Sequence, residues 1–384
     1  MTTSGFDVAV IGGGLVGAAL AYGMADAHCR VVVLDEGDRS LRAALGNFGL
    51  VWVQGKGADC PPYARWTLGS ARRWPELAQR LQEETGIDVA LSQPGGLHLC
   101  LSEREAALRA EKVARMQAQR VAPLRGPEGA RTQEDGAAAH VEMLDRTALR
   151  RMLPDVGPDV VAASYCRDDG QVNPLRLLRA LREAFERRGG TMMADAEVRA
   201  VAPEGGAFTL ATARGSVHAD RVVLAAGLGS VGLAPQLGLS APLSAQRGQI
   251  VALARMPAMV PLPIETIRQT AEGTVLLGDS HEDTDSTETS TPVLASIARR
   301  ALRALPGLAD ANVLRCWAAL RVLTPDGLPV YEQSASSPGA FLATCHSGVT
   351  LAAAHALDIA PQIAAGAISA ELEAFSSRRF DAGA

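Results

Sequence analysis

The sequence predicts an α/β protein in which a parallel sheet with covering helices is joined to a second α+β domain on a mostly antiparallel sheet. Residues 8–11 are apolar and mostly β-branched, which is typical of a strand buried on both faces. Gly12, Gly14 and Gly17 follow at the G-x-G-x-x-G spacing, and an apolar helix is predicted at 15–24. From residue 244 onward, long strands alternate with turns. The first features predict a Rossmann-like dinucleotide-binding domain, and the last predicts the second domain.

Each of the three glycines has a physical role if a dinucleotide binds at this turn. Gly12 permits the sharp turn, Gly14 removes a side chain where backbone meets a pyrophosphate, and Gly17 lets the helix pack closely on the strand. Leu15 and Val16 begin the helix, whose free N–H groups and positive dipole end face the phosphates. The alternative is a glycine-rich turn in another kind of α/β protein.

An acidic residue follows the next predicted strand, at 30–34. Asp35 ends this apolar run about 20 residues after the glycines, where a carboxylate can accept both hydroxyls of a ribose. Glu36 is the alternative, because the boundary of the strand can be wrong by one residue. The order of strand, glycines, helix, strand and acid is more specific than the glycines alone.

Size and composition limit the classes of function. A chain of 384 residues exceeds the usual size of a single core, which favours two domains. The net charge of −5 gives no general attraction to nucleic acid or to anionic membranes. The six cysteines form no C-x-x-C pair, so no metal site is predicted and a reducing compartment is favoured. The apolar stretch 8–24 is interrupted by glycines, so we expect no membrane span, no export signal and a cytoplasmic protein.

The remaining chain alternates between helical and strand patterns. Residues 37–60 are rich in small residues and predict either a loop beside a cofactor or a long surface loop. A polar tail is expected at 375–384.

We predict a discontinuous dinucleotide-binding domain at 1–85, 150–243 and 321–384, and a substrate domain at 86–149 and 244–320. Helices are predicted at 61–85, 103–120, 144–152, 175–188, 292–305 and 351–365, a loop at 121–133, and strands at 87–91, 97–101, 160–166, 191–201, 207–211, 216–219, 221–225, 249–254, 264–269, 274–277, 313–321, 329–331 and 340–343.

Four motifs in this order resemble the FAD-dependent D-amino-acid oxidase superfamily, in its glycine oxidase and sarcosine oxidase branch. They are Val-Ile-Gly-Gly-Gly-Leu-Val-Gly at 10–17, Asp-Gly-Gln-Val-Asn-Pro at 169–174, Val-Val-Leu-Ala-Ala-Gly at 222–227, and the C-terminal set at 319–321, 324–329 and 346–350. Within the branch, residues 46–52, 268–270 and 276–280 look most like flavoprotein subunits of opine, hydroxyproline and related secondary-amine dehydrogenases. Such relatives often work beside further subunits, so additional subunits of a hetero-oligomeric dehydrogenase are possible partners.

The resemblance implies how FAD would be bound. Asp35 would hold the adenosine ribose, Val198 the adenine, and Ala226 and Gly227 would close over the dinucleotide. The covalent-flavin sarcosine oxidases carry a cysteine where this chain has Ala319, so the implied FAD is non-covalent. The implied contacts along the flavin are Arg42, Ala43, Asn47, Gly49 and Leu50, with Gly348, Val349, Thr350 and Leu351 bringing a helix N-terminus to its pyrimidine ring.

The resemblance also implies catalytic residues and a reaction. Arg321 resembles the arginine that clamps a substrate carboxylate, although an arginine at a strand end can also be structural. Arg268 is a second candidate for the clamp, and His346 lies either near the flavin edge or in a structural position. The implied substrate is a small molecule with a carboxylate, an amino acid or secondary amino acid of D-amino acid, hydroxyproline or opine type. Its C–N bond would be oxidised to an imine by hydride transfer to flavin N5.

Two other functions remain open at this point. An NAD-dependent dehydrogenase would explain the N-terminal unit, but not the small residues at 225–227 or the motif at 346–350. A FAD-bearing subunit that only relays electrons or assembles a complex would be inactive alone.

Overall fold

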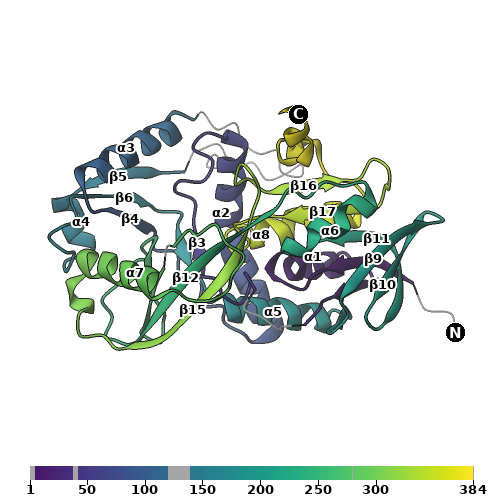
Figure 1. Ribbon diagram of the computed structural model, residues 1–384, viewed down its shortest axis with the longest axis horizontal. Helices are drawn as coiled ribbons and strands as arrows, with labels where there is room; N and C mark the ends of the chain where they lie inside the picture. Colours follow the sequence, from purple (N-terminus) through teal and green to yellow (C-terminus); the bar gives the residue numbers. More distant parts are fainter. Residues whose placement is uncertain (1–4, 38–41, 120–138, 279, 384) are drawn as a thin grey trace.

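The computed structural model describes residues 5–37, 42–119, 139–278 and 280–383. The loop predicted at 121–133 and Asp279 of the 276–280 motif lie outside these ranges. Figure 1 shows two units side by side, one around the sheet of β1 and β11 and one around the strands β12 and β15. The predicted α/β class is confirmed.

The first unit is built on a largely parallel sheet with β1 (Phe6–Ile11) at its centre. β1 pairs in parallel with β2 (Val31–Leu34) on one side and with β11 (Gly215–Leu224) on the other. All four residues of β2 are buried, as expected for a strand covered by helices on both faces. The other strands of this sheet are β8 (Thr191–Met193), β17 (Ala340–Thr344), the antiparallel β16 (Val330–Gln333), and the hairpin of β9 (Val198–Glu204) and β10 (Ala207–Thr212).

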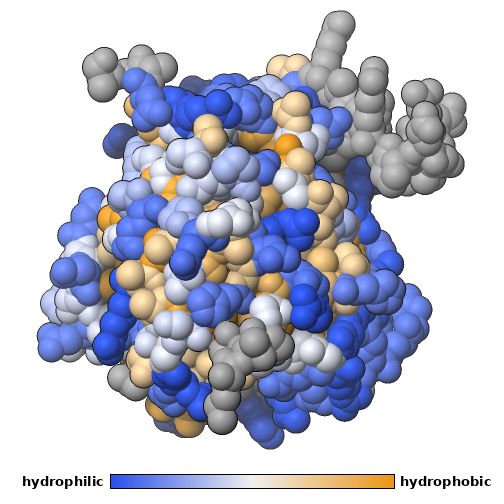
Figure 2. Space-filling view, turned by 90° about the vertical axis from the view of Figure 1, so that its right-hand side faces the viewer, coloured by the Kyte–Doolittle hydropathy of each residue, from blue (hydrophilic) through white to orange (hydrophobic). Residues whose placement is uncertain are grey.

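The end of the molecule that carries the β9–β10 hairpin has a mixed surface. Figure 2 shows polar and apolar side chains interspersed on this face, with polar ones dominating its rim. A surface of this kind is normal for a face that meets solvent, because a folded protein always exposes many apolar atoms.

Helix α1 (Leu15–Asp26) is nearly enclosed by the rest of the first unit. Ten of its 12 residues are buried. A Cβ at Gly23 would lie 2.0 Å from the carbonyl oxygen of Ala356, so α1 contacts the C-terminal helical segment backbone to backbone. The helices α2 (Pro61–Thr85), α5 (Pro174–Arg187), α8 (Ala352–Ala354) and α9 (Ala360–Ala364) contact α1, and α6 (Ser230–Leu233) packs against β9.

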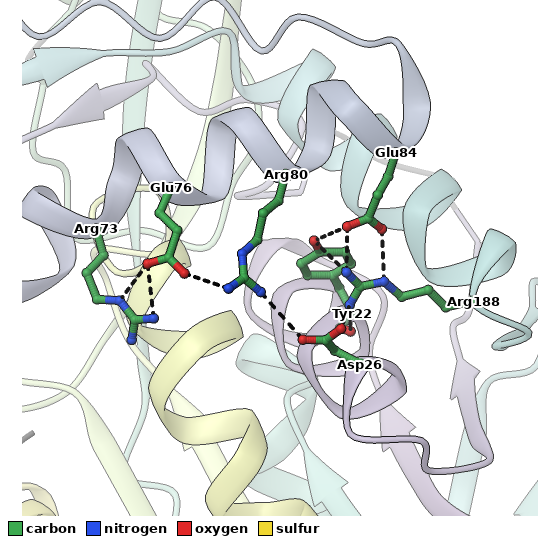
Figure 3. A network of polar contacts seen from close by, with 7 residues as sticks. All are labelled: Tyr22, Asp26, Arg73, Glu76, Arg80, Glu84 and Arg188. Atoms are coloured by element: carbon green, nitrogen blue, oxygen red, sulfur yellow. Dashed lines mark hydrogen bonds and ion pairs between the residues drawn. The ribbon is translucent and has the colours of Figure 1, made fainter. Parts of the chain in front are cut away.

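A polar network fastens α1, α2 and the end of α5 together (Figure 3). The Arg188 guanidinium lies 4.0 Å from the centre of the Tyr22 ring and donates a hydrogen bond of 2.8 Å to Glu84. The Tyr22 hydroxyl donates to the same carboxylate over 2.8 Å. Because these groups come from three helices, the network fixes the helical layer that supports β1.

The second unit is antiparallel, as the sequence predicts. β12 (Ser244–Arg255) pairs along its length with β15 (Val313–Leu323), and β6 (Ala162–Cys166) pairs with β4 (Gly96–Cys100) and β5 (Val141–Asp145). The division of the chain into two domains stays a prediction, and because of these pairs we propose that β6 belongs with the second domain. The remaining elements of this unit are β13 (Ile267–Gln269), β14 (Thr274–Leu277), α3 (Glu103–Ala118), α4 (Arg146–Met152) and α7 (Thr291–Ala304).

Several local predictions were wrong, each for an identifiable reason. Residues 87–91 form no strand, because Ala90 adopts a positive φ of 55° and the Asp88 side chain accepts a hydrogen bond from its N–H. The predicted loop at 37–60 contains a short strand, β3 (Leu50–Val51), which pairs with β7 (Gly170–Gln171). The predicted tail 375–384 is not free, because Phe375 is buried against aromatic rings and a 3-10 helix follows it.

The C-terminal helical segment is interrupted rather than continuous. Residues 355–359 form a π-helical turn between α8 and α9, although a single helix was predicted at 351–365. Pro361 lies in the first turn of α9, where a missing N–H leaves no hydrogen bond unmade. No helix in the described ranges is both long and apolar enough to cross a membrane.

Candidate active site

A cavity of about 480 Å³ lies where the central parallel strands end. Ile11, Leu34 and Thr344, the last residues of β1, β2 and β17, line it, as does Ala225 just beyond β11. The carboxyl end of parallel strands is where α/β sheets bind ligands, because loops and helix N-termini gather there. From the predicted site, the lining includes Gly12, Gly14, Leu15, Val16, Asp35, Glu36, Arg42, Ala43, Asn47, Val198, Ala226, Gly227, His346 and Gly348.

The glycine turn brings backbone close to backbone. Gly12 has a φ of 102°, and a Cβ there would lie 2.6 Å from the carbonyl oxygen of Ala225. A Cβ at Gly17 would lie 1.9 Å from the carbonyl oxygen of Gly12, so only glycine lets α1 start this close to β1. Gly14 is different, because the nearest atom to a Cβ there is 3.8 Å away and the residue faces the cavity.

Asp35 is buried and accepts hydrogen bonds on both of its carboxylate oxygens. Its carboxylate accepts from the N–H groups of Gly13 (2.7 Å) and Gly37 (2.9 Å) and from the Arg42 guanidinium (2.9 and 3.1 Å). Burial by itself would raise the pKa of Asp35, but these hydrogen bonds and the charge of Arg42 together hold it below its ordinary value. The Glu36 side chain is 57% exposed and lies 3.8 Å from Arg42, so it is the less constrained of the two acids.

The segment after β17 packs on the loop that contains β3. His346 and Gly348 line the cavity, whereas Val349, Thr350 and Leu351 are buried behind it. The Thr350 hydroxyl oxygen accepts a hydrogen bond of 3.0 Å from the N–H of Trp52. This contact joins two segments about 300 residues apart, which sequence alone cannot reveal.

Arg321 lies in a polar setting on β15. Its guanidinium donates to the carbonyl oxygens of Ser280 (2.6 Å) and Arg247 (3.3 Å). A Cβ at Gly248 on the neighbouring strand would come within 2.6 Å of it, so the glycine makes room for the guanidinium. The arginine is half-buried and is not part of the cavity lining.

Arg268 and His346 both have a pKa that burial lowers. Arg268 is 4% exposed and its Nε donates to the carbonyl oxygen of Phe48. Burial lowers its pKa to about 10, which leaves it charged at neutral pH. Burial, with the positive charges of Lys56 and Arg321 nearby, lowers the pKa of His346 to about 3, so this imidazole is neutral at pH 7.

Some predicted residues lie outside the cavity lining, and some lining residues were missed. Arg182 on α5 lines the cavity and donates to the carbonyl oxygen of Gly13 (2.8 and 3.2 Å). No sequence pattern points to it, because α5 carries several arginines and only tertiary packing selects one. The predicted residues outside the lining are Gly17, Gly49, Leu50, Val349, Thr350, Leu351, Arg268 and Arg321.

A family model described as FAD dependent oxidoreductase, DAO, matches residues 7–361. The chain belongs to this family. As a DAO-family enzyme it is an FAD-dependent oxidoreductase, which confirms the predicted superfamily and cofactor and excludes the NAD-dependent alternative. Among the residues that the structure describes, no cluster of side chains is suited to a metal ion.

The DAO-family chain is similar to two opine oxidase subunits over nearly its whole length. It is 45% identical to an opine oxidase subunit from Agrobacterium tumefaciens (strain Ach5), over 98% of each chain. It is 43% identical to the corresponding opine oxidase subunit from Rhizobium meliloti, again over 98% of each. The crystal structure of glycine oxidase from Geobacillus kaustophilus superposes with a TM-score of 0.85 at 25% identity, covering 97% of this chain and 98% of that one.

Proposed function

We propose that this chain is the FAD-bearing, substrate-oxidising subunit of an opine oxidase type of enzyme. It removes a hydride, that is two electrons with one proton, from the α-carbon next to the nitrogen of a neutral secondary amine that carries a carboxylate, and the resulting protonated imine hydrolyses in water. The observation that carries the proposal is the 45% and 43% identity to two opine oxidase subunits, over 98% of both partners in each comparison.

The cavity fits FAD, which when bound supplies the two-electron acceptor. The pyrophosphate would be held by the all-glycine turn from Gly12 to Gly14 and by the N-terminus of α1. Asp35 would accept a ribose hydroxyl, and Ala226 and Gly227 would cover the dinucleotide from the other side. Asn47, His346 and Gly348 line the cavity and would contact the ring end of the cofactor.

The role proposed for Arg321 is to hold the substrate carboxylate. Its guanidinium donates from Nη1 to two carbonyl oxygens, which fix its position, and a planar guanidinium suits a two-pronged bond to a carboxylate. Holding the carboxylate places the α-carbon at a fixed position, and such orientation lowers a barrier by several kcal/mol when the geometry is close to reactive.

The protonation states of the surrounding groups favour a neutral amine. His346 is uncharged at neutral pH, and the basic groups of Lys56 and Arg321 lie near it. Positive charge lowers the pKa of a bound amine, because it opposes the ammonium form. Loss of the amine proton to solvent is then sufficient, and no dedicated base is required.

Product analysis tests this function. The purified holoenzyme would be incubated with an opine and an artificial electron-accepting dye, and the products identified by mass spectrometry. The proposal expects one amino acid and one 2-oxo acid in equal amounts. Dye reduction without C–N cleavage would contradict it.

A second candidate is a FAD-bearing subunit that relays electrons and has no turnover alone. The observation that favours it is that the similar proteins are named as subunits. Complete inactivity of the isolated chain at full flavin occupancy, with activity restored only by other subunits, would support the relay function.

A further inference from the structure

The chain uses lysine at two positions only, and the two lysines lie together. Of its 37 basic residues, all are arginine except Lys56 and Lys112. Lys56 lies in the loop between β3 and α2, and Lys112 lies on α3, more than 50 residues away. Every other residue of the lysine and arginine type is arginine, so the compact, strongly hydrated side-chain ammonium group occurs only at these two positions.

The loop geometry places the backbone next to Lys56 against basic groups of α3. Gly55 has a φ of 91°, and a Cβ there would lie 3.2 Å from Lys112 Nζ and 3.3 Å from an Arg109 guanidinium nitrogen. Arg109 is held from behind, because it donates to the Ser164 hydroxyl (2.7 Å) and to the Gln54 side-chain carbonyl (2.6 Å). The turn of Gly55 and Lys56 therefore lies directly on two basic groups of α3.

Neither lysine has a direct counter-ion within the described ranges of the chain, and burial lowers the pKa of both side chains. Arg109 donates its hydrogen bonds to neutral oxygens. Lys56 and Lys112 have no hydrogen-bond or ion-pair partner among the described residues. The carboxylate of Glu265 lies near all three basic groups, but His98 contacts it directly. Glu265 is the carboxylate that all three basic groups share, with Asp169 also near Arg109 and Asp59 near Lys112. Neither lysine forms a direct ion pair with any of them, so a further anion would be favoured beside Lys56.

The cluster borders the groups assigned to the substrate. The positive charge of Arg321 lowers the pKa of Lys56, and the charge of Lys56 in turn lowers the pKa of His346, which lines the cofactor cavity. Cys345, the neighbour of His346, is close enough to Lys56 for the two to interact electrostatically. Lys56 therefore interacts electrostatically with Lys112 of α3 and also with Arg321 and His346.

We propose that Lys56, supported by Lys112, forms a second anion subsite that binds the second carboxylate of a dicarboxylic secondary amine, while Arg321 binds the first. This inference rests on the proposed function and narrows its substrate class. In an opine, two carboxylated carbons are joined through one nitrogen, so its two carboxylates are close together and require two neighbouring cationic sites. An amino acid with a single carboxylate leaves the Lys56 subsite without a charge partner.

The test compares two unreactive thioethers that differ by one carboxylate. Thiodiacetate has two carboxylates, (methylthio)acetate has one, and in both a sulfur replaces the amine nitrogen, so neither can be oxidised to an imine. Their dissociation constants would be measured on the holoenzyme from the perturbation of the flavin spectrum. We expect the wild-type protein to prefer thiodiacetate at least tenfold, and Lys56→Met to bring this preference close to one.

Three variants make the outcome decisive. Lys112→Met should reduce the preference less than Lys56→Met does, and Lys56→Gln replaces the first variant if Lys56→Met loses its flavin. Arg104→Met removes a charge from an exposed position on the same helix and should keep the wild-type preference. A wild-type protein without preference, or a preference that survives both Lys56 variants, would overturn the inference.

Failure of the proposed function has a different signature. In that case the holoenzyme still distinguishes the two thioethers through Lys56, yet no secondary amino acid reduces its flavin. Failure of the inference alone leaves amine oxidation intact, with equal binding of the two thioethers.

Discussion

The Arg42 guanidinium and the Asp35 carboxylate form a two-pronged ion pair beside the cofactor cavity, with nitrogen–oxygen distances of 2.9 and 3.1 Å. The sequence assigned these residues to opposite parts of the cofactor, Asp35 to the ribose and Arg42 to the flavin side. In the structure they constrain each other, and the N–H of Gly13 in the glycine turn donates to the same carboxylate. The pair therefore links the loop after β2 to the start of α1.

Asp35→Asn should weaken both FAD binding and the fold. The substitution removes the carboxylate charge that forms the two-pronged pair with the Arg42 guanidinium, and removing one partner of a buried pair costs about 3–5 kcal/mol. We expect the lower end, because the Arg42 side chain is 25% exposed. Urea unfolding and FAD titration would measure the two effects. Glu36→Gln, an exposed neighbour, is the matched control, and an equal loss from it would move the ribose contact to Glu36.

Gly17→Ala should disrupt the dinucleotide turn. Its Cβ would meet the carbonyl oxygen of Gly12 at 1.9 Å, and overpacking of this kind costs about 1–3 kcal/mol or more. We expect a lower melting temperature and little retained FAD. Gly232→Ala is the control, because no atom lies within 4 Å of a Cβ there. If the two variants retain FAD equally, α1 does not need its close contact with β1.

Arg321→Ala should leave FAD bound but weaken carboxylate substrates. Loss of one partner of a partly buried charge pair costs about 2–5 kcal/mol in binding. Arg321→Lys keeps the charge but cannot form the planar two-pronged bond, so its loss should be intermediate. Steady-state kinetics with flavin content measured in parallel would check this. Unchanged kinetics in Arg321→Ala would remove the clamp.

Acid should destabilise the protein through Glu265. Burial would raise the pKa of this carboxyl, but His98, Arg109 and Lys112 outweigh it and bring the pKa to about 2, below its ordinary value of 4.5. A folded-state pKa below the unfolded one means that this stabilisation is present above pH 4.5 and is lost as the pH falls toward 2. Free energies of unfolding measured across this range should fall less steeply in Glu265→Gln. Identical slopes would show that Glu265 contributes nothing.

FAD should be released intact when the protein is denatured. Ala319 stands where a covalent attachment would need a cysteine, and Cys316 on the same strand is the nearest thiol in sequence. After acid precipitation we expect yellow supernatant and colourless protein. Flavin that stays in the pellet of the wild-type protein but not of Cys316→Ala would reveal a covalent bond to that thiol.

The sequence predicted the parts of the fold that depend on local pattern. The buried strand and the glycine spacing each depend on consecutive residues, and each forms as expected. The helix predicted at 175–188 forms as α5, and the Asn173 side chain before it accepts hydrogen bonds of 3.1 Å from two N–H groups. Contacts between distant segments were missed. Arg182 on Gly13, Thr350 on Trp52, and Lys56 near Lys112 depend on how the segments pack, and no periodicity or spacing reports that.

The central claim is tested most directly by mixing the holoenzyme with an opine in the absence of oxygen and recording flavin absorption. The account predicts that the visible flavin band bleaches in a single turnover, and that Arg321→Ala bleaches far more slowly at the same opine concentration. A flavin band that stays unchanged with opines and with other secondary amino acids, in a protein fully loaded with FAD, would contradict it.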